Sequence, residues 1–230
     1  MQAAASTTQR PPAAGIEPRG PAAYVAELLG TFLLVLFICM IVSDTAVLGV
    51  KDFAVIGLLH AFLLGMLIYT LGATSGGHFN PAVSVALMAI RKIRPVDAVI
   101  YIVMQLTGAI AGAYVCKALL LDAGKSVHYG ATTVSTALSG NRTVAALVVE
   151  ALGTFALMWA IMGTAVNPRG NRAWAGFVIG TTLAFAVMTF APLTGASFNP
   201  ARSLGPALAS ATWTDFWIYI VGPLVGATIA

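Results

Sequence analysis

Charged side chains are scarce in this chain. Asp, Glu, Lys and Arg together make up 9% of its 230 residues, and hydrophobic residues make up 59%. A typical soluble domain has about 25% charged residues. The mean hydropathy is +0.90. This composition excludes an ordinary water-soluble domain and indicates a chain that is filled by membrane-spanning segments.

Cysteine is scarce too, because the sequence contains only Cys39 and Cys116, both within apolar segments. There is no disulfide framework and no Cys-x-x-Cys motif, and we expect two small, buried, apolar side chains. The three histidines, His60, His78 and His128, lack the spacing of metal ligands.

Motifs of catalysis are missing as well, since the sequence shows no nucleophile triad and no phosphate-binding loop. The sequence therefore favours neither an enzyme nor a resident metal or cofactor. The net charge of +4 reflects Lys and Arg residues in loops, and it does not indicate a surface that binds nucleic acid.

Long apolar runs fill most of the chain. A membrane span needs about 20 such residues, and the expected spans are 22–42, 53–73, 96–118, 143–166, 174–193 and 214–230. Residues 1–20 have no apolar periodicity and predict a disordered tail before one membrane domain over 21–230, with no cleavable signal peptide. The sequon Asn141-Arg142-Thr143 lies too close to the fourth span to predict glycosylation.

One motif occurs twice. Ser75–Ser84 and Thr194–Ser203 are identical at six of ten positions, at an offset of 119, and both contain Asn-Pro-Ala. Asn suits the cap of a helix and Pro its first position. Segments 80–90 and 199–210 are too short to cross, and non-helical backbone survives at membrane depth only when it is buried or lines a cavity. They predict two re-entrant half-helices whose positive ends face one pore.

The repeat extends into the spans. Glu27–Phe32 matches Glu150–Phe155, and Tyr101–Val103 matches Tyr219–Val221. Three spans in each half is an odd number, so the second half must insert upside down. The sequence therefore predicts an inverted repeat, about 22–118 and 143–230, whose site lies near the membrane midplane.

On these motifs the chain resembles the aquaporins, the major intrinsic protein family, from about Ala22 to its end. The resemblance implies an all-α integral membrane channel domain with six transmembrane helices and two re-entrant half-helices. It also implies a homotetramer with one pore in each protomer, in contact with the lipid bilayer, that passes water and small neutral solutes.

The positive charges predict the orientation. One side would carry Arg10, Arg19, Arg91, Lys92, Arg94, Arg169 and Arg172, and the other Lys51, Lys117, Lys125 and Arg142. Both termini are then cytoplasmic. The Ala-rich tail and the short loops suggest a bacterial inner membrane.

The resemblance assigns roles to residues of the motif. Asn80 and Asn199 would each donate a hydrogen bond to the permeating molecule at mid-pore. Backbone carbonyls would form a ladder of acceptors along the pore, at Gly76, Gly77, His78, Gly195 and Ser197. Ionisable groups inside a span are usually paired or functional. For Glu27 and Glu150 we expect a structural role, in which they accept hydrogen bonds from the re-entrant loops, rather than a proton relay.

The family's selectivity-filter positions are found by their spacing from the two asparagines, and they fall on His60, Val187, Ala196 and Arg202. This set is similar to that of plant vacuolar (tonoplast-type) aquaporins. Members of that group tend to have a loop histidine that reaches the filter. His128 is the candidate for that role, and a solvated loop histidine is the alternative.

The sequence thus predicts a passive water channel that also passes small neutral solutes such as ammonia. One alternative is a glycerol- or urea-type facilitator, which Ser203 and Ala207 disfavour, because facilitators of the family carry Asp and a basic residue there. A coupled secondary transporter is an alternative of another class, since inverted repeats also build transporters. A non-conducting scaffold is a third.

Overall fold

The computed structural model describes residues 16–138 and 142–230. Most of the tail expected over 1–20, including Arg10, lies outside the described residues, as does Asn141 of the sequon. Residues 16–20 have no regular structure.

The described residues form α-helices and no strand. The helices are α1 (Pro21–Val47), α2 (Phe53–Ser75), α3 (Pro81–Ala89), α4 (Pro95–Lys125), α5 (Arg142–Ile161), α6 (Ala175–Thr194), α7 (Pro200–Ser210) and α8 (Ile218–Ile229). A π-helical turn, η2 (Met162–Val166), continues α5, and two 3₁₀ turns, η1 (His128–Gly130) and η3 (Arg172–Trp174), lie in loops. The expected all-α fold with two short helices is confirmed.

Local signals explain where the helices begin and end. Pro occupies the start of α1, α3, α4 and α7, where its missing N–H group costs nothing. The helices α2 and α6 end at Gly76 and Gly195, whose φ angles are 95° and 78°. A left-handed residue of this kind closes a helix, and glycine adopts it without strain. The two halves therefore enter their re-entrant segments in the same way.

The sixth span is shorter than expected. Among the residues that the structure describes, five helices are long and apolar enough to cross a membrane, whereas α8 has 12 residues, which is about 18 Å at 1.5 Å per residue. The span predicted over 214–230 begins only at Ile218. The backbone hydrogen bonds just before α8 join residues three apart, as in a turn, for example Ile218 N to Asp215 O at 3.0 Å. Asp215 itself has a φ of 56°. A left-handed residue cannot continue a helix.

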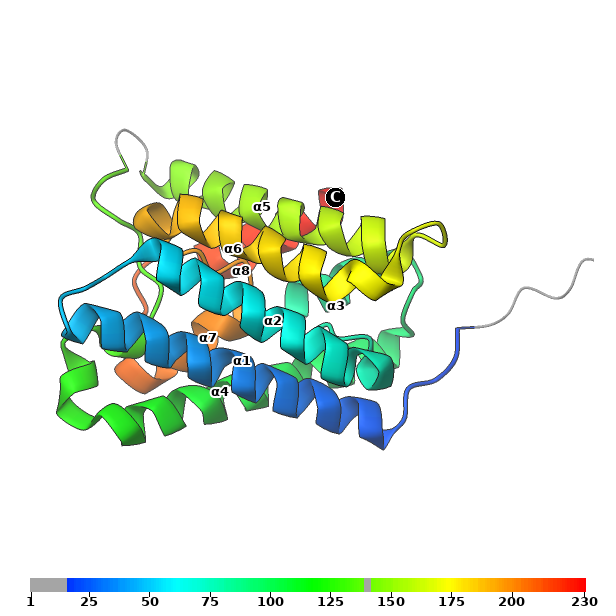
Figure 1. Ribbon diagram of the computed structural model, residues 1–230, viewed down its shortest axis with the longest axis horizontal. Coiled ribbons are helices and arrows are strands. Elements are labelled where there is room, and N and C mark those ends of the chain that lie inside the picture. Colours follow the sequence, from blue (N-terminus) through cyan, green and yellow to red (C-terminus); the bar gives the residue numbers. More distant parts are fainter. Residues whose placement is uncertain (1–15, 139–141) are drawn as a thin grey trace, which may run out of the picture.

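The helices pack in a pattern that repeats between the halves. The helix α1 packs against α4 and α2, and α5 packs against α8 and α6 in the same way. The short helices cross over, because α7 packs on α4 of the first half and α3 packs on α8 of the second. Both lie among the long helices and contact each other (Figure 1). This exchange is the arrangement of an inverted repeat.

Glycines permit close approach in both halves. A Cβ at Gly108 or Gly112 would collide with the backbone of α1, and a Cβ at Gly226 would collide with the backbone carbonyl of Ala151 in α5. Such close packing is common between membrane helices, because small residues at the interface let the two backbones approach each other.

The outward surface of the helices is apolar. Large hydrophobic side chains such as Phe62, Leu119 and Trp159 are more than 60% exposed. Soluble proteins rarely expose continuous surfaces of this kind, so the surface fits contact with a bilayer.

The α1–α4 contact generates a testable prediction. Gly108→Ala should lower the melting temperature in detergent, because the new methyl group meets the Leu28 carbonyl. Overpacking costs about 1–3 kcal/mol, or about 2–4 °C for each kcal/mol in a protein of this size. Gly163→Ala is the matched control, because nothing lies within 4 Å of its added Cβ. An unchanged melting temperature for Gly108→Ala would contradict this account of the packing.

Candidate functional site

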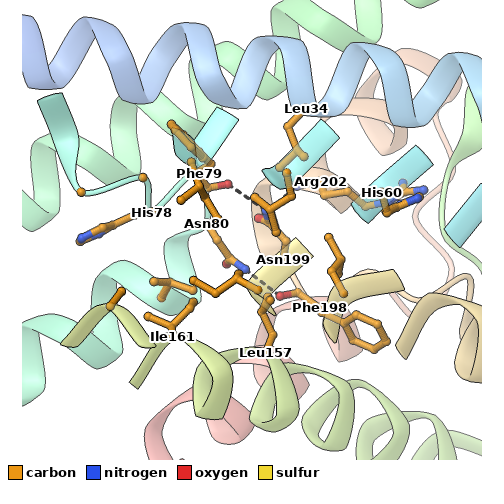
Figure 2. A pocket seen from close by; sticks show the side chains of 18 of the residues that line it. Leu34, His60, His78, Phe79, Asn80, Leu157, Ile161, Phe198, Asn199 and Arg202 are labelled. Atoms are coloured by element: carbon orange, nitrogen blue, oxygen red, sulfur yellow. Dashed lines mark hydrogen bonds between the residues drawn. The ribbon is translucent and has the colours of Figure 1, made fainter. Parts of the chain in front are cut away.

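The starts of α3 and α7 are tied to each other. Asn80 Oδ1 accepts from Ala82 N at 2.9 Å, and Asn199 Oδ1 accepts from Ala201 N at 3.0 Å, so each asparagine caps its own helix. The amide nitrogens cross to the other half (Figure 2). Asn80 Nδ2 donates to the Phe198 carbonyl at 2.8 Å, and Asn199 Nδ2 donates to the carbonyl of Phe79 at 2.9 Å.

Each asparagine keeps a second N–H group. A side-chain amide nitrogen has two donors, and the cross-link uses one of them. Asn80 and Asn199 line the same interior cavity. The ends of two helices with partial positive charge therefore meet at one point of this cavity, together with two hydrogen-bond donors.

Two cavities share a pair of lining side chains. The inner cavity has a mostly apolar wall and is lined by the two asparagines. The outer cavity is lined by loop residues such as Thr133 and Ser135. Their volumes are about 60 Å³ and about 320 Å³. His60 and Arg202 line both cavities. These two side chains therefore belong to the walls of both cavities.

The segments before the half-helices turn their N–H groups toward buried carboxylates. His78 N and Phe79 N donate to Glu27 at 3.0 and 2.7 Å. Ser197 N and Phe198 N donate to Glu150 at 3.1 and 2.8 Å.

A trans peptide points its carbonyl opposite to the N–H of the next residue. The carbonyls of Gly77, His78, Ala196 and Ser197 therefore point away from the carboxylates. Of the predicted acceptor residues, Gly76, Gly77, His78 and Ser197 line the inner cavity, and Gly195 lines the outer one.

Both carboxylate oxygens of Glu27 and of Glu150 accept hydrogen bonds. Beside the two backbone groups, Glu27 accepts from Ser75 Oγ at 2.6 Å and from Gln105 Nε2 at 2.7 Å. Glu150 accepts from Thr194 Oγ1 at 2.7 Å. Both glutamates are fully buried. A buried carboxylate survives when its oxygens are all hydrogen-bonded, and these bonds hold the re-entrant segments in place.

Further supports, which were not predicted from the sequence, occur in matching places of both halves. Tyr101 Oη donates to the carbonyl of Ser75 at 2.6 Å, and Tyr219 Oη donates to the carbonyl of Thr194 at 2.9 Å. Each carbonyl belongs to the last residue of a long helix. The signal was present, because both tyrosines occur at matching positions of the repeat.

Strained backbone accompanies these supports. Phe79 and Phe198 have φ angles of 45° and 54°, and such strain persists only where the surroundings determine the conformation. Their rings lie against Gly30 and Gly153, where no Cβ would fit.

Arg202 is buried one turn into α7, with 3% of its surface exposed. Its Nη1 donates to the carbonyl of Gly130 at 2.9 Å. Its Nε finds no hydrogen-bond partner within residues 16–138 and 142–230. Gly130 was not expected at the site, because a loop carbonyl leaves no signature in a sequence.

The other predicted filter residues differ in whether they line a cavity. His60 Nδ1 contacts the Ile56 carbonyl at 2.7 Å. A carbonyl only accepts, so Nδ1 carries the proton and Nε2 of the neutral ring is an acceptor. Val187 lines the outer cavity, and Ala196 is buried but is not among the residues that line either cavity. His128 is exposed, lies 3.3 Å from Thr212 Oγ1 and lines neither cavity.

Metal ligands do not gather anywhere in the part of the chain that the structure describes. No group of three His, Cys, Asp or Glu side chains there could hold a metal ion. The expectation that the protein has no metal and no cofactor stays a prediction.

Comparison with known proteins gives consistent matches over most of the chain. The family model described as major intrinsic protein matches residues 19–230. The chain is 40% identical to a glycerol uptake facilitator protein-like 6 of Lactiplantibacillus plantarum, over 90% of this chain and 94% of that one. It is 36% identical to a probable aquaporin AqpM of Archaeoglobus fulgidus, over 90% and 93% of the two chains.

One plant protein and one solved structure complete the comparison. Nodulin-26 of Glycine max is 36% identical over 88% of this chain and 73% of its own. The X-ray structure of the aquaglyceroporin from Plasmodium falciparum superposes with a TM-score of 0.75 over 90% of this chain and 92% of that chain. It is 24% identical, so it supports the fold.

The buried carboxylates generate the second prediction. Glu27→Gln replaces one carboxylate oxygen with an NH2 group, which cannot accept a hydrogen bond from the N–H and O–H groups around it. A buried hydrogen-bonding group left unsatisfied costs about 1–3 kcal/mol. We expect a lower melting temperature in detergent and a loss of water flux in proteoliposomes. Glu17→Gln is the control, because Glu17 is exposed. Wild-type stability and flux in Glu27→Gln would show that the carboxylate does not hold the segment.

Proposed function

This chain belongs to the major intrinsic protein family, and on that premise we propose that it is a passive water channel that also passes small neutral solutes such as ammonia. Members of this family are membrane channels, and the apolar helices make the chain a multi-pass integral membrane protein. The observation that carries the proposal is the pair of cross-linked asparagines, each with a spare N–H group, in one narrow cavity.

Water would exchange its bulk hydrogen bonds for those of the cavity. The wall is mostly apolar, so a water molecule finds partners only along one line of polar groups. The carbonyls of Gly77, His78 and Ser197 would accept its hydrogens. Asn80 and Asn199 would donate to its oxygen where the half-helices meet. A line of weak partners lets water both enter and leave.

Cations and protons would be opposed at two places. The two helix ends put partial positive charge beside the asparagines. Arg202 adds a full charge at the proposed junction of the two cavities. A cation therefore meets repulsion at both places, and the helix ends turn water dipoles in opposite directions in the two halves, which opposes proton hopping.

The junction would set the range of solutes. His60, Val187, Ala196 and Arg202 are the proposed filter, and the aliphatic side chain of Val187 leaves more room than an aromatic one. His60 Nε2 is an acceptor at this point, and Arg202 Nε is a donor without a partner in the described chain. Together they would bind a small molecule that both donates and accepts, such as ammonia or water.

The likeness to plant vacuolar aquaporins rests on these four residues alone. The plant relative compared above is nodulin-26 and the others are microbial. We therefore assign the solute range from the chemistry of the junction and not from any single relative.

A glycerol- or urea-type facilitator is the second candidate. It is favoured by the 40% identity to a protein described as a glycerol uptake facilitator. Coupled transport is disfavoured, because Glu27 and Glu150 already accept four and three hydrogen bonds respectively. Both oxygens of each carboxylate are already engaged in holding the re-entrant segments.

Assembly and orientation complete the proposal. We propose a homotetramer in the cell (inner) membrane, by analogy with the family, with both termini cytoplasmic. The loops that carry Arg91–Arg94 and Arg169–Arg172 lie at the end of the bundle where α1 begins (Figure 1). Positive charge gathers on the cytoplasmic side of membrane proteins.

The direct test is flux through proteoliposomes. We expect osmotic shrinkage much faster than that of bare lipid, and fast internal alkalinisation in an ammonium gradient with no electrical current. Fast glycerol uptake would favour the facilitator. Current, or solute uptake that follows a proton gradient, would favour a transporter. Shrinkage no faster than that of bare lipid would refute the water channel.

The filter generates the third prediction. His60→Phe combined with Val187→His places two aromatic rings at the junction and should lower ammonia flux while water flux persists. Each flux is measured against the wild type at equal protein density. Phe62→Leu is the control, because Phe62 is 74% exposed on the outside of the bundle. Equal loss of both fluxes would show that the pair does not select between the two solutes.

A further inference from the structure

Lys117 lies in α4 with its charge turned toward the protein. Its Nζ donates to the carbonyl of Ala209 at 2.6 Å, and its side chain is partly buried. The same Nζ lies 5.6 Å from the ring centroid of Tyr129 and 5.7 Å from that of Tyr114. A lysine near the end of a spanning helix ordinarily extends toward the lipid headgroups. Lys117 instead makes specific contacts with a helix and a loop.

Its first partner is the far end of the half-helix that carries Arg202. Ala209 lies in the last turn of α7, where carbonyls have no partner within the helix. A helix end of this kind also carries partial negative charge. The ammonium group of Lys117 donates a hydrogen bond to one of these free carbonyls, and its positive charge is attracted to the negative helix end.

Its second partner belongs to the loop that holds Arg202 itself. Tyr129 is 3% exposed, and its hydroxyl donates to the carbonyl of Leu121 at 2.8 Å. The next residue is Gly130, whose carbonyl accepts from Arg202 Nη1. Lys117 therefore contacts the helix that carries Arg202 and also the residue beside its hydrogen-bond acceptor.

The two contacts would act together on the guanidinium group. Residues of the Asn199 loop and Glu150 hold the start of α7, and Lys117 holds its end. The half-helix is 11 residues long. If the end of this short helix is free to tilt, the side chain of Arg202 moves relative to the Gly130 carbonyl.

We propose that Lys117 is a positioning residue that fixes Arg202 across the junction of the two cavities and so sets the solute range of the channel. The inference rests on the proposed function, because it concerns the passage of solutes through that junction. His128 contributes a second, weaker link through Thr212, two residues beyond α7.

The test compares variants by the ratio of urea flux to water flux in proteoliposomes. Lys117→Met removes the donor and the charge but keeps the length. The ratio should rise about tenfold or more, on the scale of one lost hydrogen bond to a charged group. Lys117→Arg should keep the wild-type ratio, because it restores charge and donor. Lys125→Met is the matched control, since Lys125 is an exposed residue of the same helix that pairs with Asp122.

A ratio is the readout because a structural defect alone would lower both fluxes together. A wild-type ratio in Lys117→Met, or equal loss of both fluxes that Lys117→Arg does not restore, would overturn the inference. If Lys117→Met is not recovered in folded form, Lys117→Leu, which also removes both the donor and the charge, gives the same comparison. Wild-type protein that conducts no water would instead refute the proposed function.

Discussion

The structure depends on two buried carboxylates that collect backbone N–H groups at membrane depth. Backbone that leaves a helix inside a membrane has no water to bind, and each unsatisfied group costs several kcal/mol. Glu27 and Glu150 accept hydrogen bonds from these backbone N–H groups in the segments before α3 and α7. Because they accept the N–H groups, the carbonyls of the same peptides are left for the cavity. One interaction therefore stabilises the fold and also creates the polar line inside it.

The inverted repeat supplies each half with the same supports but not with the same cavity. The pairs Tyr101 and Tyr219, and Phe79 and Phe198, make equivalent contacts. The repeat is broken at the position of Arg202, where the first half has Val83. Symmetry thus builds the centre, where two asparagines meet, and the difference between halves places one buried arginine in the wall of the cavity.

Most of the fold could be predicted because its signals are local or periodic. Apolar length and the two Asn-Pro pairs predicted the long helices and both half-helices close to their bounds. The start of α8 was missed, because nothing in the sequence around Asp215 shows a left-handed turn. The contact of Arg202 with Gly130, and that of Lys117 with Ala209, join a side chain to a distant carbonyl. Every residue has a carbonyl, so no pattern marks the one that is used.

The same reasoning applies to His128, whose role at the filter stays a prediction, and to Lys117, whose contacts no sequence pattern indicates. A histidine in an outer loop near the filter invited a role at the filter, and a lysine in the same region was counted only as a surface charge. The loop turns through left-handed residues at His128, Tyr129 and Gly130. These turns bring the Gly130 carbonyl to Arg202, while the histidine contacts Thr212. The surroundings of Arg202 are therefore a joint product of α4, α7 and the loop between α4 and α5, which meet through the contacts of Lys117 and Gly130.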